Sequence, residues 1–193
     1  MPNHFYAMMS RMKNIFRWGL MRNTRRENLS EHSLEVAQIA HALAIINRKR
    51  LGGNANPEFT ATAAIYHDTS EIITGDMPTP IKYYNDEIKE AYHQIEAAAQ
   101  NQLSEMLPED FKEDFERIYN PDPLTMKLIK AADKLSALIK CIEELNMGNK
   151  EFAVAKKSIQ KTIHEMDCPE AEIFLSEFMP SFELSLDEQR EIL

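Results

Sequence analysis

The chain has 193 residues, of which 44% are hydrophobic and 27% charged, and these proportions exclude wholesale disorder and fit one domain spanning residues 1–193. Its 22 basic and 31 acidic residues give a net charge of −9 and a pI of about 5.2, which argues against a partner that is a nucleic-acid polymer. Five glycines are too few for a Gly-rich phosphate loop, and two cysteines are too few for a disulfide scaffold. Because we find no secretory leader and no apolar run of about 20 residues, we expect a cytoplasmic protein with no membrane partner.

The charge is unevenly placed along the chain. Residues 1–26 carry no acidic side chain but six basic ones, namely Arg11, Lys13, Arg17, Arg22, Arg25 and Arg26. Such a segment is typical of a nucleic-acid arm, a targeting peptide, a phosphate pocket or simply a helix with a basic polar face. A targeting peptide is disfavoured because the segment runs without a break into residues 28–32, where a helix is expected.

Apolar residues recur at three- and four-residue spacing nearly throughout, and sustained period-two alternation is absent, which predicts an all-α chain. In chain order we expect a helix over residues 5–16, a second from the N-cap Ser30 to residues 51–53 and a third from the N-cap Asn56 through Ile65. A fourth helix is expected from residue 84 or 85 towards Leu107, and a fifth from about Leu128 to Leu145 with Gly148 as its C-cap. Two further helices are expected over residues 150–166 and 171–178. Residues 75–80 hold two prolines and are predicted to be non-helical, and residues 120–123 are predicted to form a turn.

Four segments place metal-competent or phosphate-competent side chains at helix ends, in turns or inside a helix, namely residues 31–33, 66–71, 75–80 and 131–134. His67 and Asp68 diverge by about 100° on a helix, yet both can reach an ion that lies between them. Glu71 is four residues beyond His67 and projects from the same helix face. Asp133 lies beside the apolar stripe of its helix, where a lone carboxylate is costly unless it is paired or ligated.

Two nitrogen and two oxygen donors would come from His32, His67, Asp68 and Asp133. This mixed set suits Mn²⁺, Fe²⁺, Co²⁺ or Zn²⁺ better than Ca²⁺ or Mg²⁺. Four protein ligands leave open positions only on a five- or six-coordinate ion, which argues mildly against tetrahedral zinc. The alternatives are a capping role for His32, a hydrogen-bonded pair for His67 and Asp68, and an ion pair of Asp133 with Lys130.

The order His…His-Asp…Asp on separate helices resembles the HD-domain metallophosphohydrolase superfamily, and most closely its bacterial 5′-deoxynucleotidases (YfbR-like proteins). The resemblance covers nearly the whole chain and shows no departure at a motif position. The HD pattern alone is moderately specific, whereas the Arg-Trp and Gly-Asp-x-Pro-Thr-Pro elements are much more so. The matching stretches are residues 17–22, 30–34, 66–71, 74–80, 130–133, 180–182 and 184–188.

The resemblance implies a single-domain helical bundle of the HD type that works as a homodimer. It implies one divalent metal per chain, held by His32, His67, Asp68 and Asp133. We expect Co²⁺ or Mn²⁺, with Zn²⁺, Fe²⁺ or Ni²⁺ as alternatives. The implied substrate is a deoxyribonucleoside 5′-monophosphate (dNMP), which is hydrolysed to deoxyribonucleoside and phosphate in preference to ribonucleotides.

The implied roles fall on a small set of side chains. Substrate binding is expected from Arg17, Trp18, His32, Asp68, Asp76, Met77, Pro78, Thr79 and Asp133, and catalysis from Glu71, Arg17 and Asp68. Arg17 can orient the phosphate with its planar fork. Trp18 offers a flat wall that leaves no space for a 2′-hydroxyl, unless it serves ordinary core packing. Asp76 can accept a hydrogen bond from the 3′-hydroxyl, and Glu71 can orient the attacking water or protonate the leaving oxygen.

Two other functions stay open. Another HD phosphohydrolase, acting on ppGpp or a dNTP, would need more basic side chains around the second and fifth expected helices than the sequence provides. A non-catalytic nucleotide sensor is disfavoured because the ligand set and Glu71 are intact. Base recognition is open between residues 82–84 and the partner subunit.

Overall fold

The computed structural model describes residues 3–82 and 84–190. In chain order its elements are α1 (Phe5–Met9), η1 (Ser10–Asn14), α2 (Leu29–Arg50), α3 (Pro57–Ile65), α4 (Glu71–Thr74), α5 (Thr79–Lys82), α6 (Asp86–Ser104), η2 (Glu109–Phe111), α7 (Lys112–Tyr119), α8 (Pro123–Asn146), η3 (Lys150–Phe152), α9 (Ala153–Glu165), α10 (Pro169–Glu177), η4 (Met179–Glu183) and α11 (Leu186–Arg190). Within these ranges no strand forms, and one isolated antiparallel bridge joins Phe16 to Asn28. The all-α prediction is confirmed, and no described helix has the length and apolarity needed to span a bilayer.

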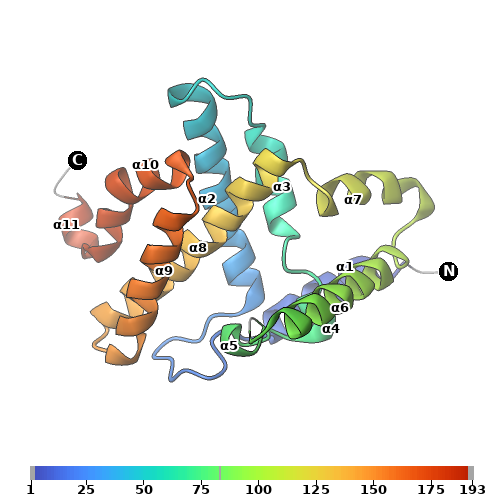
Figure 1. Cartoon of the computed structure of the whole chain (residues 1–193), viewed down its shortest axis with the longest axis horizontal. Coiled ribbons are helices and arrows are strands. Elements are labelled where there is room, and N and C mark those ends of the chain that lie inside the picture. The colour runs from blue at the N-terminus through green and yellow to red at the C-terminus, as the bar shows by residue number, and fades with distance from the viewer. Residues whose placement is uncertain (1–2, 83, 191–193) are drawn as a thin grey trace.

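Helices α2 and α8 cross at the centre of the molecule, with α3 packed against both (Figure 1). Their apolar faces form the main core, whose fully buried members include Val36, Leu43, Leu128, Leu135, Leu138 and Ile142. Each such side chain contributes about 1.5–3 kcal/mol through burial of its apolar surface. The stripe predicted on α8 therefore faces the core, and it holds the middle of α8 rigidly beside the start of α2.

A second, smaller core lies where α1, α6 and α7 meet, around Phe5, Leu103, Leu107 and Phe115. Helix α7 was not predicted, because it is short and strongly charged, and Phe115 is its one fully buried side chain. Helices α9, α10 and α11 lie on the side of the α2–α8 pair that faces away from this second core (Figure 1).

The first turn of α2 is fixed by a reciprocal cap. The side chain of Asn28 accepts hydrogen bonds from the backbone amides of Ser30 and Glu31, and the Glu31 carboxylate accepts one from the amide of Asn28. The prediction of Ser30 as N-cap was therefore wrong by two residues. The Asn56 cap of α3 is confirmed, since its side chain accepts from the amide of Phe59.

The helix predicted over residues 5–16 ends at Met9 and tightens into η1, after which Ile15 is extended. The backbone then pairs with the segment before α2, because the amide of Arg17 donates to the carbonyl of Glu27 and the amide of Leu29 donates to that of Ile15. These long-range bonds replace the helical ones. They turn residues 15–28 into a loop, hereafter the N-terminal loop.

The N-terminal loop is also fastened to α8. The carboxylate of Glu144 accepts hydrogen bonds from the backbone amides of Thr24 and Arg25, at 2.9 and 3.1 Å. Lys140 donates to the carbonyl of Arg25 and to Glu144, and both charged side chains are buried. A buried ion pair that caps backbone groups of a loop holds that loop in one conformation.

The segment predicted to be non-helical over residues 75–80 is so only in part. Gly75 adopts a left-handed φ of +73° and ends α4, as expected for a turn. Thr79 and Pro80 nevertheless begin the short helix α5. Proline is tolerated there because the first turn of a helix has no internal acceptor for its missing N–H.

Candidate active site

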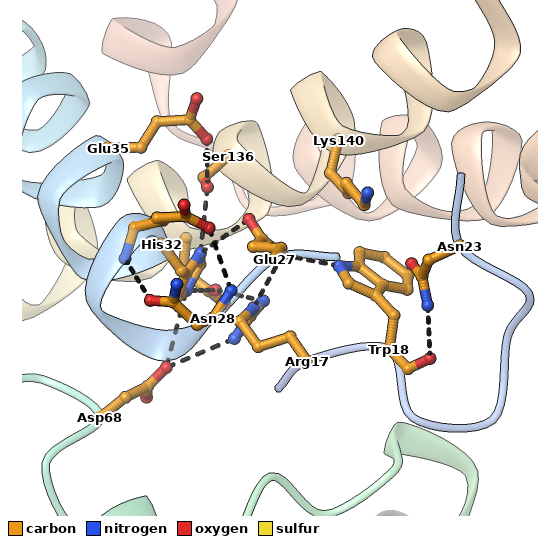
Figure 2. Close-up of polar contacts among 12 residues, drawn as sticks. Arg17, Trp18, Asn23, Glu27, Asn28, His32, Glu35, Asp68, Ser136 and Lys140 are labelled. Atoms are coloured by element: carbon orange, nitrogen blue, oxygen red, sulfur yellow. Dashed lines mark hydrogen bonds and ion pairs between the residues drawn. The ribbon is translucent and has the colours of Figure 1, made fainter. Parts of the chain in front are cut away.

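Arg17 and the four residues predicted as metal ligands lie close together where the N-terminal loop, the start of α2, the residues between α3 and α4, and the middle of α8 meet. Arg17 lies on the loop and His32 on the first turn of α2, next to Asp68 in the α3–α4 connection (Figure 2). Asp133 projects from α8 towards the same place, since its Oδ1 is 3.2 Å from Nε2 of His32. Residues from four segments thus share one site.

One potential ligand atom each from His32, His67 and Asp68 lies within 4.8 Å of the other two. The Oδ2 atom of Asp68 is 3.1 Å from Nε2 of His67 and 3.6 Å from Nε2 of His32. We call these three residues the histidine–aspartate cluster. Among the described residues, Asp133 lies beside this cluster but does not come as close to all three of its members as they come to one another. Its cationic neighbour on α8 is Lys134 at 2.9 Å, not Lys130 as the alternative reading required.

The cluster fits a divalent cation. The Nε2 atoms of His32 and His67 are buried and have no hydrogen-bond partner within the described part of the chain, although carboxylate oxygens lie 3.1–3.6 Å away. Donor atoms that each lie about 2.1 Å from one ion are about 3.0–3.4 Å apart. The nitrogen and oxygen atoms of this cluster lie at such distances without hydrogen bonding to one another, which is the arrangement expected of metal ligands.

The tautomer of His67 is set from behind the ring. Its Nδ1 lies 2.7 Å from the carbonyl oxygen of Ala64, which can only accept, so Nδ1 carries the hydrogen. The neutral ring therefore presents a lone pair at Nε2, on the side of the cluster. Burial opposes the charged ring, but the carboxylate of Asp68 outweighs it and raises the pKa of His67, so a proton and a cation compete for Nε2.

His32 is oriented through two residues that the sequence analysis missed. Its Nδ1 lies 3.0 Å from Oγ of Ser136, and this hydroxyl donates its hydrogen to Oε2 of Glu35 at 2.6 Å. The hydroxyl must then accept from Nδ1–H, which leaves a lone pair on Nε2. Figure 2 shows Glu35, Ser136 and His32 in this order. The available signal was spacing, since Glu35 follows His32 by three residues and Ser136 follows Asp133 by three.

We expect Ser136→Ala to weaken metal binding about 10–100-fold, the usual loss when a hydrogen bond behind a histidine ligand is removed. The affinity for Mn²⁺ is measured by titration calorimetry on the folded, metal-stripped protein. Ser33→Ala is the matched control, because its hydroxyl is buried one residue from His32 and has no hydrogen-bond partner among the described residues. Equal affinities of the two variants would show that His32 needs no hydroxyl behind it.

Arg17 supplies a buried positive charge beside the cluster. Its guanidinium nitrogens lie 3.5 Å from Asp68 and 3.8 Å from Asp133, and only 12% of the side chain is exposed. Burial opposes this charge, but the carboxylates of Asp133 and Asp68 outweigh it and raise the pKa of Arg17. Burial likewise opposes the charges on the two carboxylates, yet His67 holds the pKa of Asp68, and His32 that of Asp133, well below the usual range.

The carboxyl group of Glu71 differs from those of Asp68 and Asp133, because its pKa is raised and not lowered. It is buried at the start of α4, and its Oε2 has no hydrogen-bond partner among the described residues. Burial, together with the nearby charges of Asp68 and Asp76, raises the pKa of Glu71 to about 9. Burial also raises the pKa of Asp76. The pKa of Glu71 is thus raised while that of its neighbour Asp68 is lowered, and neighbouring carboxyl groups whose pKa values are pushed apart in this way are typical of acid–base pairs in active sites.

Trp18 is half-buried and held in an unusual conformation. Its backbone φ is +61°, which costs of the order of 1–3 kcal/mol for a bulky residue and persists only where the surroundings hold it. The indole packs 5.3 Å from the ring of Phe152, and its N–H donates to Glu27 at 2.9 Å. Asn23 donates to the Trp18 carbonyl. A half-exposed indole on a strained backbone next to Arg17 differs from an ordinary core tryptophan.

The turn after α4 lies near the N-terminal loop, because burial raises the pKa of Asp76 while Arg17 and the backbone of Trp18, both on that loop, oppose the rise. Met77 and Pro78 are half-buried and Thr79 is exposed. Within the described part of the chain, these three residues make no hydrogen bond or ion pair with the histidine–aspartate cluster. Tyr83, a candidate for base recognition, lies outside the described residues.

Solved structures share this arrangement of helices. An HD-domain phosphohydrolase from Listeria innocua superposes with a TM-score of 0.81 at 24% identity, covering 98% of this chain and 93% of that one. The HD phosphohydrolase of cyanophage S-2L, solved with dA and one catalytic Zn²⁺, superposes with a TM-score of 0.63 at 23% identity, covering 92% of this chain and 93% of that one. The fold is therefore that of the HD-domain phosphohydrolases.

The sequence narrows this class to one family. Residues 4–182 match the family model described as 5′-deoxynucleotidase YfbR-like. A 5′-deoxynucleotidase of Vibrio parahaemolyticus is 53% identical over 189 residues, which are 96% of this chain and 97% of that protein. The chain belongs to the YfbR-like 5′-deoxynucleotidase family, and the resemblance drawn from its motifs is confirmed.

Proposed function

We propose that this protein is a metal-dependent 5′-deoxynucleotidase, which hydrolyses dNMPs to deoxyribonucleoside and phosphate and selects against ribonucleotides. The observation that carries the proposal is the convergence of His32, His67 and Asp68 beside the buried guanidinium of Arg17, in a chain of this family. A cation site next to a fixed positive charge suits a phosphate monoester, whose charge both can offset.

We assign His32, His67, Asp68 and Asp133 as the ligands of one divalent ion per chain, with Co²⁺ or Mn²⁺ as the expected metal. A nitrogen–oxygen donor set of this kind supports that choice over Ca²⁺ or Mg²⁺. A bound ion at this place lowers the pKa of a water molecule and offsets charge on the phosphoryl oxygens. Because the cyanophage relative in fold carries Zn²⁺, zinc belongs in the test beside cobalt and manganese.

The chain's own residues divide the remaining work. Arg17 orients the phosphate, and Asp68 both holds the ion and fixes Arg17 in place. Glu71 is protonated near neutral pH, so it can give a proton to the 5′-oxygen of the departing nucleoside. Asp76 accepts a hydrogen bond from the 3′-hydroxyl. Trp18 forms the wall of the sugar site, with Met77, Pro78 and Thr79 closing its other side.

The test is a phosphate-release screen over dNMPs, NMPs, dNTPs and ppGpp with Mn²⁺, Co²⁺ or Zn²⁺. We expect release from dNMPs, with little from NMPs and none from the larger anions. Turnover of dNTPs or ppGpp instead would identify another HD phosphohydrolase. Binding of dNMP without any release would identify a nucleotide sensor.

We expect Trp18→Ala to narrow the preference for dAMP over AMP. Exclusion of a 2′-hydroxyl by shape is worth about 10–200-fold in kcat/KM, and trimming the indole makes room for that hydroxyl. The change should come partly from faster AMP hydrolysis and not only from slower dAMP hydrolysis. Both substrates are measured on both proteins at one metal concentration. Equal proportional losses on the two sugars would make Trp18 a packing residue.

We further propose that the chain acts as a one-domain homodimer in the cytoplasm. Large apolar side chains are exposed on several elements, among them Leu34 on α2, Ile65 on α3 and Tyr84 before α6, with exposed fractions of 59%, 44% and 77%. A subunit interface that included these side chains would bury them. Sedimentation equilibrium measures the state directly, and a mass equal to one chain at micromolar concentration would contradict a stable dimer.

A further inference from the structure

Glu27 is the residue on which the two halves of the proposed substrate site meet. Its Oε2 accepts a hydrogen bond from the indole N–H of Trp18 at 2.9 Å and one from Nε of Arg17 at 3.3 Å. Its Oε1 lies 4.0 Å from Nδ1 of His32, and only 13% of the side chain is exposed. Figure 2 shows its carboxylate between Trp18, Arg17 and His32.

We propose that Glu27 is the positioning residue for sugar selectivity, because one carboxylate oxygen fixes both the wall at Trp18 and the phosphate-binding guanidinium of Arg17. The inference rests on the proposed function, since it assigns to Glu27 the relative placement of two groups that touch the substrate. Glu27 itself touches neither the reacting phosphorus nor the leaving oxygen in this scheme.

On the side of Arg17, the contact decides which nitrogens stay available. The guanidinium has five N–H donors in a planar fork, and Glu27 takes the one on Nε. The two terminal nitrogens are thereby turned towards Asp68 and Asp133, where the phosphate would lie beside the cluster. The backbone carbonyl of Glu27 also accepts from the amide of Arg17, so side chain and main chain act together.

On the side of Trp18, Glu27 fixes the rotation of the ring. The indole has a single donor, and its hydrogen bond to Oε2 fixes the edge of the ring that packing on Phe152 cannot orient by itself. The left-handed backbone of Trp18 is secured separately, through the hydrogen bond from Asn23 to its carbonyl. Removing the Glu27 carboxylate therefore frees the ring while leaving the backbone turn in place.

The first experiment needs no substrate. Trp18 is the only tryptophan of the chain, so intrinsic fluorescence reports on this ring alone. We expect Glu27→Ala to shift the emission maximum to longer wavelength and to raise the acrylamide quenching constant, with an unchanged circular dichroism spectrum. Glu27→Gln keeps an acceptor for the indole and should remain close to the native protein in quenching. Glu143→Gln, on α8 and half-buried, is the matched control and should change neither property.

The second experiment measures kcat/KM for dAMP and AMP. We expect Glu27→Ala to lower the dAMP:AMP ratio about 10-fold or more, within the range that shape exclusion provides. In a Trp18→Ala background the same change should leave the ratio as it is, because Glu27 then has no ring to hold. Glu27→Gln should retain most of the ratio while raising KM for both sugars, since the charge facing Arg17 is lost.

The outcomes distinguish failure of the role proposed for Glu27 from failure of the proposed 5′-deoxynucleotidase activity. Native quenching in Glu27→Ala, or a lowered ratio that persists undiminished in the Trp18→Ala background, would overturn the role of Glu27. Absence of dNMP hydrolysis by the native protein would instead refute the proposed function. Fluorescence would then still decide whether Glu27 holds the ring.

Discussion

We expect Glu71→Gln and Glu71→Ala to lower kcat for a dNMP about 10²–10⁴-fold, the usual loss when a positioned acid or base is removed. Burial and two neighbouring carboxylates keep Glu71 protonated near neutral pH, and it lies outside the proposed ligand set. Metal content and KM are therefore expected to stay close to those of the native protein. Single-turnover phosphate release, together with metal analysis, measures the two effects separately.

The glutamine variant preserves the volume of the buried side chain, so a loss of activity in it cannot be attributed to a cavity. Glu90→Gln, on the exposed face of α6, is the control for removal of one negative charge. A native kcat in both Glu71 variants would move the proton-transfer role to Asp76, whose pKa is also raised by burial.

We expect Asp133→Ala to abolish stoichiometric metal binding and phosphate release while the helical fold survives. The loss in affinity should exceed about 100-fold, because substitutions behind a ligand already cost 10–100-fold. The fold is expected to persist because α8 is anchored by its buried stripe, including Leu128, Leu135 and Leu138, and not by Asp133. Elemental analysis after dialysis against Mn²⁺ gives the metal content, and circular dichroism gives the helix content.

Asp133 is the most informative of the four proposed ligands to test because it lies beside the cluster formed by His32, His67 and Asp68 and not within it. Lys130→Ala serves as the control on the same helix, one turn earlier, and should retain the metal. One tightly bound ion per chain in Asp133→Ala would reduce the ligand set to three residues. Asp133→Asn, which keeps the shape of the side chain, should also lose most of the bound metal.

The parts of the site that lie on long, strongly patterned helices could be predicted from sequence. The apolar stripe of α8 fixed the face on which Asp133 lies, and the Asn56 cap fixed the start of α3 that leads to His67. Local periodicity and capping chemistry are sufficient for such assignments, because they depend on neighbours within one or two turns.

The residues that orient the site could not be predicted, because their contacts join distant segments. Ser136 and Glu35 are 101 residues apart in sequence, and neither is unusual within its own helix. Glu27 was indistinguishable from any acidic residue at the edge of a basic segment. The break after Met9 was missed for the same reason, since the pairing of residues 15–17 with residues 27–29 overrides a helical pattern that is locally sound.

The clamp between Glu144 and the amides of Thr24 and Arg25 has a consequence for biosynthesis. These bonds span 119 and 120 residues, so the N-terminal loop, although made early, cannot be fastened until α8 has left the ribosome. The His32–Ser136 contact spans 104 residues, so His32 in the histidine–aspartate cluster also cannot be oriented until α8 has been synthesised. Nascent chains that end before Glu144 thus hold Arg17, Trp18 and His32 without the contacts that place them, and we expect competence for substrate to wait for α8.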